Sequence, residues 1–354
     1  MESESDSPVE TSDGDERTVS DTEEDTDTRR TSYAFENLHL KSKLFLRITG
    51  FRVIEFEKIV YPLVAGAIDI LFQSRRGPSR KLSKKSHAVL VLFYLRRGLP
   101  FFDIAPHFNL TEASTRRIIH SLVPPICGRL DQLLIKWVDW RNQSMHIDEE
   151  AEPLLWRVVG IVDATELEVG RPRSNDEQRQ FYSGKKKKHT VKFQVVVRPV
   201  GGRIMHVFGP EPGSIHDIRV FDRSGVADMM HRREVILADS GYQGLESRNV
   251  NCVIPRKKPR NSERSEEDSA YNTMISRHRV LVENVIGLVK EWKIVGRRWR
   301  GKLHQHSFLR SVFRLCCIFT NIKIKLHEMP LLIEGDQEES EHESDENESD
   351  EQDE

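Results

Sequence analysis

Residues 234–244, EVILADSGYQG, place a carboxylate directly after a short apolar run. The run Val235–Ala238 contains β-branched residues and has no helical period, so it predicts a buried strand that ends at Asp239. A carboxylate at the mouth of a buried strand needs solvation, hydrogen bonds or a cation. Ligands in α/β sheets bind outside the carboxyl ends of the strands, which makes Asp239 a candidate site residue. A turn or helix N-cap is the alternative role for this residue.

Two further stretches place charged side chains in comparable positions. Residues 157–164, RVVGIVDA, predict a second apolar strand that ends in Asp163. Residues 270–292 predict a helix on which Arg279, Glu283 and Lys290 share one face, because they are spaced by four and then by seven. An ordinary surface ion pair is the alternative for Arg279 and Glu283. Two Asp and one Glu from two strands and a helix are the oxygen ligands that two-metal phosphoryl chemistry requires.

Six ordered blocks of this sequence resemble the successive motifs of a known family. They lie at residues 163–165, 181–192, 213–217, 237–244, 256–260 and 282–290. The blocks are similar to those of the DDE-superfamily endonucleases, the transposase-derived nucleases of the PIF/Harbinger and related insertion-sequence type. Two departures leave the subfamily open. Ser276 stands where bacterial relatives often carry Tyr, and Glu283-Asn-Val-Ile-Gly differs from the Glu-Arg-x-Phe-Gly that Harbinger members more often carry.

The resemblance implies a fold and a chemistry. The expected fold class is α/β, a ribonuclease-H-like mixed sheet with flanking helices, preceded by an all-α helix-turn-helix module. The implied catalytic and metal-binding residues are Asp163, Asp239 and Glu283, with Mg²⁺ or Mn²⁺ as the cofactor. One ion would activate water and the second would stabilise the leaving 3′ oxygen of a phosphodiester. Arg279 and Lys290 would orient phosphates.

The order of predicted elements agrees with that fold. Residues 190–197 and 203–208 alternate around Pro199-Val-Gly-Gly and predict a hairpin after the first strand. A helix, the strand before Asp239, a fifth strand and the helix of Glu283 follow. Residues 303–327 predict a last helix that covers the sheet, with Cys316 and Cys317 as core residues. We expect the nuclease domain to span residues 154–330.

Residues 33–145 form the expected helical region, with a helix-turn-helix at about 81–125. Ser83 is placed to cap a helix that Gly98 stops, Pro100 opens a second helix, and Thr111 is placed to cap a third that Pro124-Pro125 ends. The third helix would enter the major groove through Arg116 and Arg117. Three short helices are also a common packing unit, so contact with DNA is one of two open roles.

The net charge of −2 conceals a strongly basic body. Residues 1–28 hold 12 acidic residues and one Arg, and residues 334–354 hold 13 acidic residues and no Lys or Arg. The remainder carries 53 basic and 31 acidic residues, about +22, the sign expected of a nucleic-acid partner. Residues 1–32 and 334–354 cannot bury a core, so we expect two disordered acidic tails.

Two dense basic runs flank the proposed site, and both suit contact with the DNA backbone. Their residues are Lys185, Lys186, Lys187 and Lys188, then Arg256, Lys257, Lys258 and Arg260. Nuclear-import signals have the same composition, so we expect the nucleus, with the cytoplasm, as the location. Ser214 or His216 is placed to cap the following helix, with Asp217 in its first turn. A supporting contact near the metals is the second role for His216 and Asp217.

Several other classes of protein are disfavoured. The four cysteines form no C-x-x-C pair, which indicates neither a zinc site nor a disulfide framework. The longest apolar run, residues 59–72, is too short to span a bilayer, and the acidic N-terminus is unlike a signal peptide. The leading hypothesis is a metal-dependent DNA endonuclease. The alternative is a host-adopted transposase that binds DNA or a protein and no longer cuts, and a separate DNA-binding partner protein and a homo-oligomer both stay open.

Overall fold

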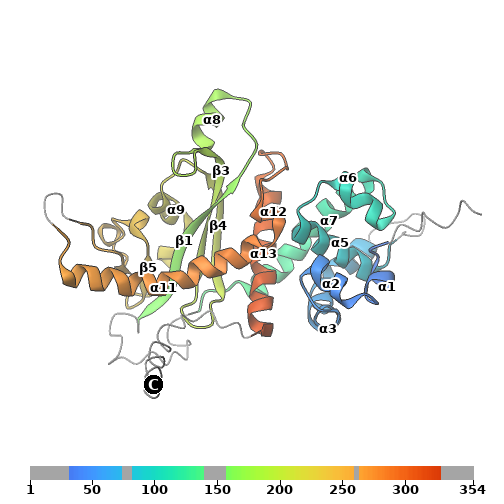
Figure 1. The fold of residues 1–354 in the computed structure, drawn as a ribbon, viewed down its shortest axis with the longest axis horizontal. Helices are drawn as coiled ribbons and strands as arrows, with labels where there is room; N and C mark the ends of the chain where they lie inside the picture. Colours follow the sequence, from blue (N-terminus) through green and yellow to red (C-terminus); the bar gives the residue numbers. More distant parts are fainter. Residues whose placement is uncertain (1–31, 74–81, 139–156, 259–262, 328–354) are drawn as a thin grey trace, which may run out of the picture.

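The computed structural model describes residues 32–73, 82–138, 157–258 and 263–327 (Figure 1). Both expected acidic tails lie outside these residues, apart from Ser32 at the end of the first. Arg260 of the second basic run and the polar stretch 139–156 lie outside them as well.

A mixed six-stranded sheet forms the centre of the C-terminal half (Figure 1). Its strands pair in the order β4-β3-β1-β5-β6, and β2 pairs with the start of β3. β1, β3 and β4 are antiparallel neighbours, whereas β5 and β6 run parallel to β1. The strands are β1 Val158–Glu168, β2 Tyr182–Ser183, β3 Lys188–Val197, β4 Ile204–Pro212, β5 Val235–Ala238 and β6 Cys252–Val253. The expected mixed α/β fold, with its hairpin and later parallel strands, is confirmed.

The first strand is longer than the sequence predicted. The expectation that it ends at Asp163 is wrong, because β1 stays paired with β3 as far as Glu168, opposite Thr190. The parallel pairing with β5, in contrast, stops at Val162 and Ala238. Asp163 therefore lies within β1, at the point where β5 leaves the sheet.

Helices cover both faces of the sheet. On one face, α11 (Glu266–Lys290) buries Val282 and Val285, and α13 (His306–His327) stacks Phe313 on Phe193 with ring centroids 3.9 Å apart. On the other face, Phe221 of α9 (Asp217–Ser224) packs with Val162, Val196 and Ile236. The expectation that α13 covers the sheet with apolar residues inward is confirmed, and Cys316 and Cys317 are fully buried.

The helix-turn-helix region follows its predicted start and stop signals. Ser83 caps α5 (Lys84–Arg97) through the backbone N–H of Ser86, and Gly98 ends it in the left-handed region at φ 59°. Pro100 precedes α6 (Phe101–Ile104), which tightens into the 3₁₀ turn η2 (Ala105–Phe108) before Asn109. Thr111 caps α7 (Glu112–Leu134) through the N–H of Ser114.

The expectation that Pro124-Pro125 ends the third helix is wrong, because α7 continues to Leu134. Both prolines lie on the exposed face of α7, whereas their neighbours Val123, Ile126 and Cys127 are buried on the opposite face. Packing of that apolar stripe offsets the hydrogen bonds that the prolines cannot donate.

α13 lies between the sheet and the N-terminal helices and joins them (Figure 1). Arg314 of α13 donates to both carboxylate oxygens of Asp131 on α7, each at 2.7 Å, and to the carbonyl of Val207 on β4. One hydrophobic cluster runs from Phe35 to Ile324, so the two halves share a core. The other helical segments are α1 Phe35–Leu38, α2 Ser42–Thr49, α3 Val53–Glu55, η1 Phe56–Val60, α4 Tyr61–Gln73, α8 Asn175–Phe181, α10 Val226–Met229, η4 Ser240–Tyr242, η5 Glu246–Arg248 and α12 Lys293–Gly296.

None of the helices within the described ranges combines the length and the apolar character that crossing a bilayer requires.

Candidate active site

Asp163 and Asp239 occupy neighbouring positions on two parallel strands. Val162 pairs with Ala238, and each is followed directly by one of the two aspartates. Asp163 Oδ1 accepts from the N–H of Ala164 at 2.8 Å, and Asp239 Oδ1 accepts from the N–H of Gly241 at 2.8 Å. Asp239 therefore also caps the short turn η4, so the alternative role that the sequence left open is real and coexists with the paired position.

α11 brings a cation and a third carboxylate to this pair. Arg279 Nη2 donates to Glu283 Oε1 at 3.1 Å and lies 3.9 Å from Asp239 Oδ2. The Arg279 and Asp239 side chains are each 18% exposed, whereas that of Glu283 is 53% exposed. The guanidinium thus lies between a mostly buried carboxylate and one that solvent reaches freely.

The electrostatics of the site raise the pKa of Asp163 from 3.8 to about 6. Burial is the largest cause, and the nearby charges of Asp239 and Asp217 act in the same direction. The Ala164 N–H and Arg279 oppose the shift without cancelling it. A site in which carboxylates disfavour one another's ionisation is one in which added positive charge would be favourable.

A buried lysine holds a further aspartate beside the site. Lys192 Nζ of β3 lies 2.7 Å from Asp217 Oδ1 and 2.6 Å from the carbonyl of Ile215, and its side chain is 8% exposed. The other oxygen, Asp217 Oδ2, approaches Gly241: a Cβ there would lie 2.9 Å from it and 3.0 Å from Asp239 Oδ1. Gly241 therefore lets the two carboxylates approach the same stretch of backbone.

The expected capping role in this block is wrong for both candidates. His216 occupies the N-cap position of α9 but makes no side-chain cap hydrogen bond, and it is exposed. No side chain caps α9; Asp217 lies in its first turn, as predicted, with its carboxylate bonded to Lys192. The supporting position near Asp163 and Asp239 is thus the one that Asp217 occupies.

Lys290, at the end of α11, completes the charged stripe. Its pKa is lowered, first by burial and then by the charge of Lys186, while Asp163 and Glu166 act in the opposite direction. One lysine of the first basic run and two carboxylates of β1 therefore act on Lys290 together. Arg279 thus lies near Asp239, and Lys290 is close enough to Asp163 to be affected by its charge.

The remaining predicted DNA contacts lie on the surface. Lys185, Lys186 and Lys187 are exposed in the turn before β3, and Lys188 pairs with Glu168 at 2.8 Å. In the second run Arg256 pairs with Asp268 at 2.8 Å, and Lys257 and Lys258 are exposed. On α7, Arg116 is 57% exposed and pairs with Glu112, and Arg117 is exposed as well.

Some buried polar atoms of residues near Asp163 in the sequence or in space have no hydrogen-bond partner. They belong to Thr165, Tyr242 and Arg279. The Tyr242 hydroxyl is the most informative, because its pKa is raised well above 10 by burial and by the charges of Asp163, Asp217 and Asp239. A protonated hydroxyl close to three carboxylates is a hydrogen-bond donor without an acceptor in this structure.

No group of three or more His, Cys, Asp or Glu side chains within the described ranges is arranged to hold a metal ion. Glu283 accepts a hydrogen bond from Arg279, whose Nη2 also lies 3.9 Å from Asp239 Oδ2.

The sequence analysis did not identify a buried polar network formed by side chains of β1 and β3. It comprises Lys192, Glu166 and Thr190, in which Thr190 Oγ1 donates to Glu166 Oε2 at 2.7 Å and Lys192 Nζ lies 3.9 Å from Glu166 Oε1. A signal was present, since Lys192 interrupts the apolar run of β3 at a position that a sheet between two helical layers buries.

Comparisons with known proteins point to one family. Residues 162–321 match the family model described as DDE superfamily endonuclease, and residues 80–132 match helix-turn-helix of DDE superfamily endonuclease. A probable transposase for insertion sequence element IS702 from Microchaete diplosiphon is 26% identical over 277 residues, which cover 77% of this chain and 92% of that protein.

Two solved structures show weaker likeness. The Mos1 transposase paired-end complex with left transposon end is 13% identical over 72% of this chain and 86% of that chain, with a TM-score of 0.19. A pre-cleavage Mos1 transpososome is 11% identical over 70% and 81% of the two chains, with a TM-score of 0.18. Likeness at these TM-scores is too weak to establish a shared arrangement.

Proposed function

Because this chain belongs to the DDE superfamily of transposase-derived endonucleases, we propose that it cleaves DNA with divalent metal ions held by Asp163, Asp239 and Glu283. The observation that carries this proposal is the adjacent position of Asp163 and Asp239 on parallel strands, under a helix that supplies Glu283. The match of residues 80–132 to the helix-turn-helix family model supports DNA as the binding partner.

The donor chemistry of the site fits Mg²⁺ or Mn²⁺. Carboxylate oxygens are the ligands that these ions prefer, and the raised pKa of Asp163 marks a place where a cation would relieve repulsion between carboxylates. Glu283 is more than half exposed, so its side chain is free to turn from Arg279 toward the aspartates. When bound, the ions would stabilise the charge that develops on the transferred phosphate, and we favour two of them.

The remaining residues would hold the DNA and keep the carboxylates in place. Arg279 would bind a phosphate once Glu283 releases it, and Lys290 would face the same strand from the end of α11. Lys185–Lys188 and Arg256–Lys258 would contact the backbone on either side. Lys192 would hold Asp217 against the turn that carries Asp239.

The test is cleavage of a supercoiled plasmid by the purified full chain with Mg²⁺ or Mn²⁺. Nicking is expected to fall at least a hundredfold in each of Asp163→Asn, Asp239→Asn and Glu283→Gln. Asp176→Asn, an exposed carboxylate on α8, is the matched control and is expected to leave nicking unchanged. Activity that survives all three site substitutions would show that these carboxylates do not hold the metal ions that cleavage requires.

The second candidate is a DNA-binding module that no longer cuts. Its support is the ion pair between Arg279 and Glu283, which neutralises one carboxylate of the triad. The two functions differ in metal binding: a nuclease is expected to gain thermal stability with Mg²⁺, and to lose that gain in Asp163→Asn. A protein that binds duplex DNA with no metal-dependent stabilisation and no nicking is a binding module. For either function we propose nuclear action, with the exposed lysine run as the import signal.

A further inference from the structure

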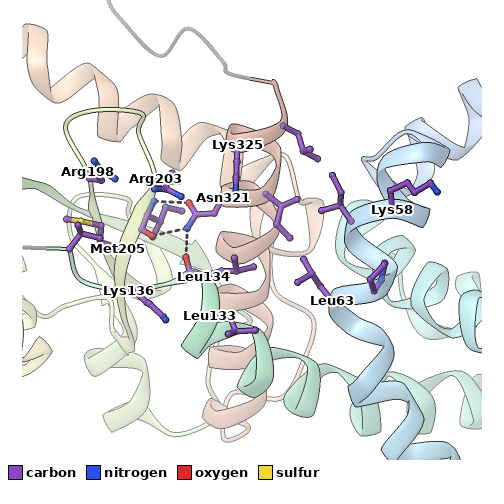
Figure 2. Close-up of a pocket in the computed structure, with 16 residues that line it drawn as sticks. Lys58, Leu63, Leu133, Leu134, Lys136, Arg198, Arg203, Met205, Asn321 and Lys325 are labelled. Carbon is purple, nitrogen blue, oxygen red and sulfur yellow. Dashed lines mark hydrogen bonds between the residues drawn. The ribbon is translucent and has the colours of Figure 1, made fainter. Parts of the chain in front are cut away.

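A groove whose lining includes neither Asp163 nor Asp239 combines an apolar floor with a basic rim. Its volume is about 720 Å³, within the range of roughly 300–1,000 Å³ that is typical of ligand pockets. Lys58 and Leu63 reach it from the helices on one side of α13, and Arg198, Arg203 and Met205 from the β3–β4 hairpin on the other (Figure 2). α7 contributes Leu133 and Leu134, and Lys136 lies just after the end of this helix.

The charge of the rim has no counterpart in the part of the chain that the structure describes. Five cations line the groove and no acidic residue does; the cations are Lys58, Lys136, Arg198, Arg203 and Lys325. None of them forms an ion pair with another described residue. Arg198 Nε is buried without a hydrogen-bond partner, and burial together with the charge of Arg203 lowers the pKa of Arg198. The groove is thus built for an anion that also brings apolar groups.

The apolar character of the groove floor argues against a ligand that consists of phosphate groups alone. It consists of aliphatic side chains, among them Ile59, Leu63, Ile204, Met205 and Leu326. Asn321, the polar residue of the floor, has its amide group bonded to Ile204 and Leu134. Water is best displaced from such a floor by apolar side chains, which nucleic-acid backbone lacks.

One segment of this chain matches both properties and begins beside the groove. Residues 329–333 read Met-Pro-Leu-Leu-Ile, and residues 334–354 hold 13 acidic residues and no Lys or Arg. Leu326 lines the groove, so Met329 is three residues away, a distance that an extended chain covers in about 10 Å. The N-terminal acidic segment offers no apolar run of this kind.

We propose that this groove is the docking site of the chain's own C-terminal segment, with residues 329–333 on the apolar floor and the acidic residues that follow against the basic rim. A second copy of the chain is a poorer occupant, because a two-fold contact through this face would set five cations against five cations. Docking would neutralise part of the basic body and fix the end of α13 to the β3–β4 hairpin.

The test uses a labelled synthetic peptide of residues 329–354 and full-length chains, with binding measured by fluorescence anisotropy. The chain that carries Leu331→Ser, Leu332→Ser and Ile333→Ser should have a vacant groove and bind the native peptide at least tenfold more tightly than the wild-type chain, whose own segment competes. Affinity should fall as salt rises, because the rim contacts are exposed charges.

Matched variants of the triple-Ser chain decide where the peptide binds. Adding Arg198→Ser and Arg203→Ser is expected to weaken binding at least fivefold, whereas Arg297→Ser and Arg300→Ser remove the same charge from an exposed loop outside the groove and should change it less than twofold. Lys136→Ser with Lys325→Ser gives a second rim pair on exposed positions if the first variant is unstable.

Three outcomes would overturn the proposal. The first is equal binding of the native peptide and a peptide with Ser at 331–333, and the second is equal effects of the rim and loop variants. The third is a wild-type dimer in sedimentation that the rim variants dissociate, which would assign the groove to a second copy. The readout is peptide binding, so nuclease activity does not affect it.

Discussion

Lys192 and Asp217 form a buried ion pair of 2.7 Å that ties β3 of the mixed sheet to the first residue of α9. Their side chains are 8% and 19% exposed. The same ammonium lies 3.9 Å from Glu166, whose side chain is 7% exposed. The positive charge of Lys192 thus balances the negative charges of two mostly buried carboxylates, Asp217 and Glu166.

Removing this cation is expected to destabilise the protein strongly. Lys192→Met leaves Asp217 and Glu166 without their counter-charge, a loss of about 3–5 kcal/mol for a buried pair that loses one partner. Lys188→Met is the matched control on the same strand, because its pair with Glu168 is exposed and is worth about 1 kcal/mol or less. Urea unfolding measures both; equal losses would show that burial does not set the strength of the Lys192 pair.

The raised pKa of Asp163 predicts how stability depends on pH. The folded state holds this proton more tightly than the unfolded chain, whose Asp has an ordinary pKa near 3.8. Its stabilising contribution is therefore complete below about pH 4 and is lost as pH rises through about 6.

Asp163→Asn removes that titration. In the absence of metal it is expected to exceed the wild type in stability by up to about 3 kcal/mol at pH 7.5 and to match it near pH 4. Denaturant unfolding between pH 4 and 8, with Asp176→Asn as the control, measures the difference. A constant difference across that range would contradict the assigned titration.

Two glycines with left-handed backbone conformation allow the cost of backbone strain to be measured separately from the cost of a steric collision. Gly98 has φ 59°, and a Cβ there would lie 2.6 Å from the backbone carbon and oxygen of Lys293. Gly225 has φ 73° with nothing within 4 Å of its Cβ position. Gly225→Ala is expected to cost about 1–2 kcal/mol from strain alone, whereas Gly98→Ala adds about 1–3 kcal/mol from the collision with α12. Thermal unfolding distinguishes them, and equal shifts would contradict the close packing of α5 on α12.

If α7 is the recognition helix, its exposed Arg116 and Arg117 are expected to make a salt-dependent contact with DNA. Arg116→Ala with Arg117→Ala is expected to weaken duplex binding about tenfold at low salt and to reduce the slope of log affinity against log salt by about 2. Arg297→Ala with Arg300→Ala is the control for loss of charge alone. If both pairs give the same slope, α7 is a packing helix and not the recognition helix.

Local signals in the sequence were sufficient for much of the fold. The caps at Ser83 and Thr111, the stop at Gly98 and the strand before Asp239 act through neighbouring backbone groups, so short stretches of sequence reveal them. The extension of α7 through Pro124-Pro125 was not predictable in this way, because packing of its buried stripe decides it.

The sequence by itself determined the order of the elements, the basic body between acidic ends and the identity of the carboxylates that a phosphoryl site would use. Only the tertiary structure decided that β1 continues past Asp163, that Arg279 of the Arg279–Glu283 pair lies beside Asp239, and that Lys192 is buried against Asp217 and Glu166. Backbone pairing with β3 sets the first feature, and side-chain contacts with residues of other elements set the other two. They depend on register and helix placement, which no local pattern contains.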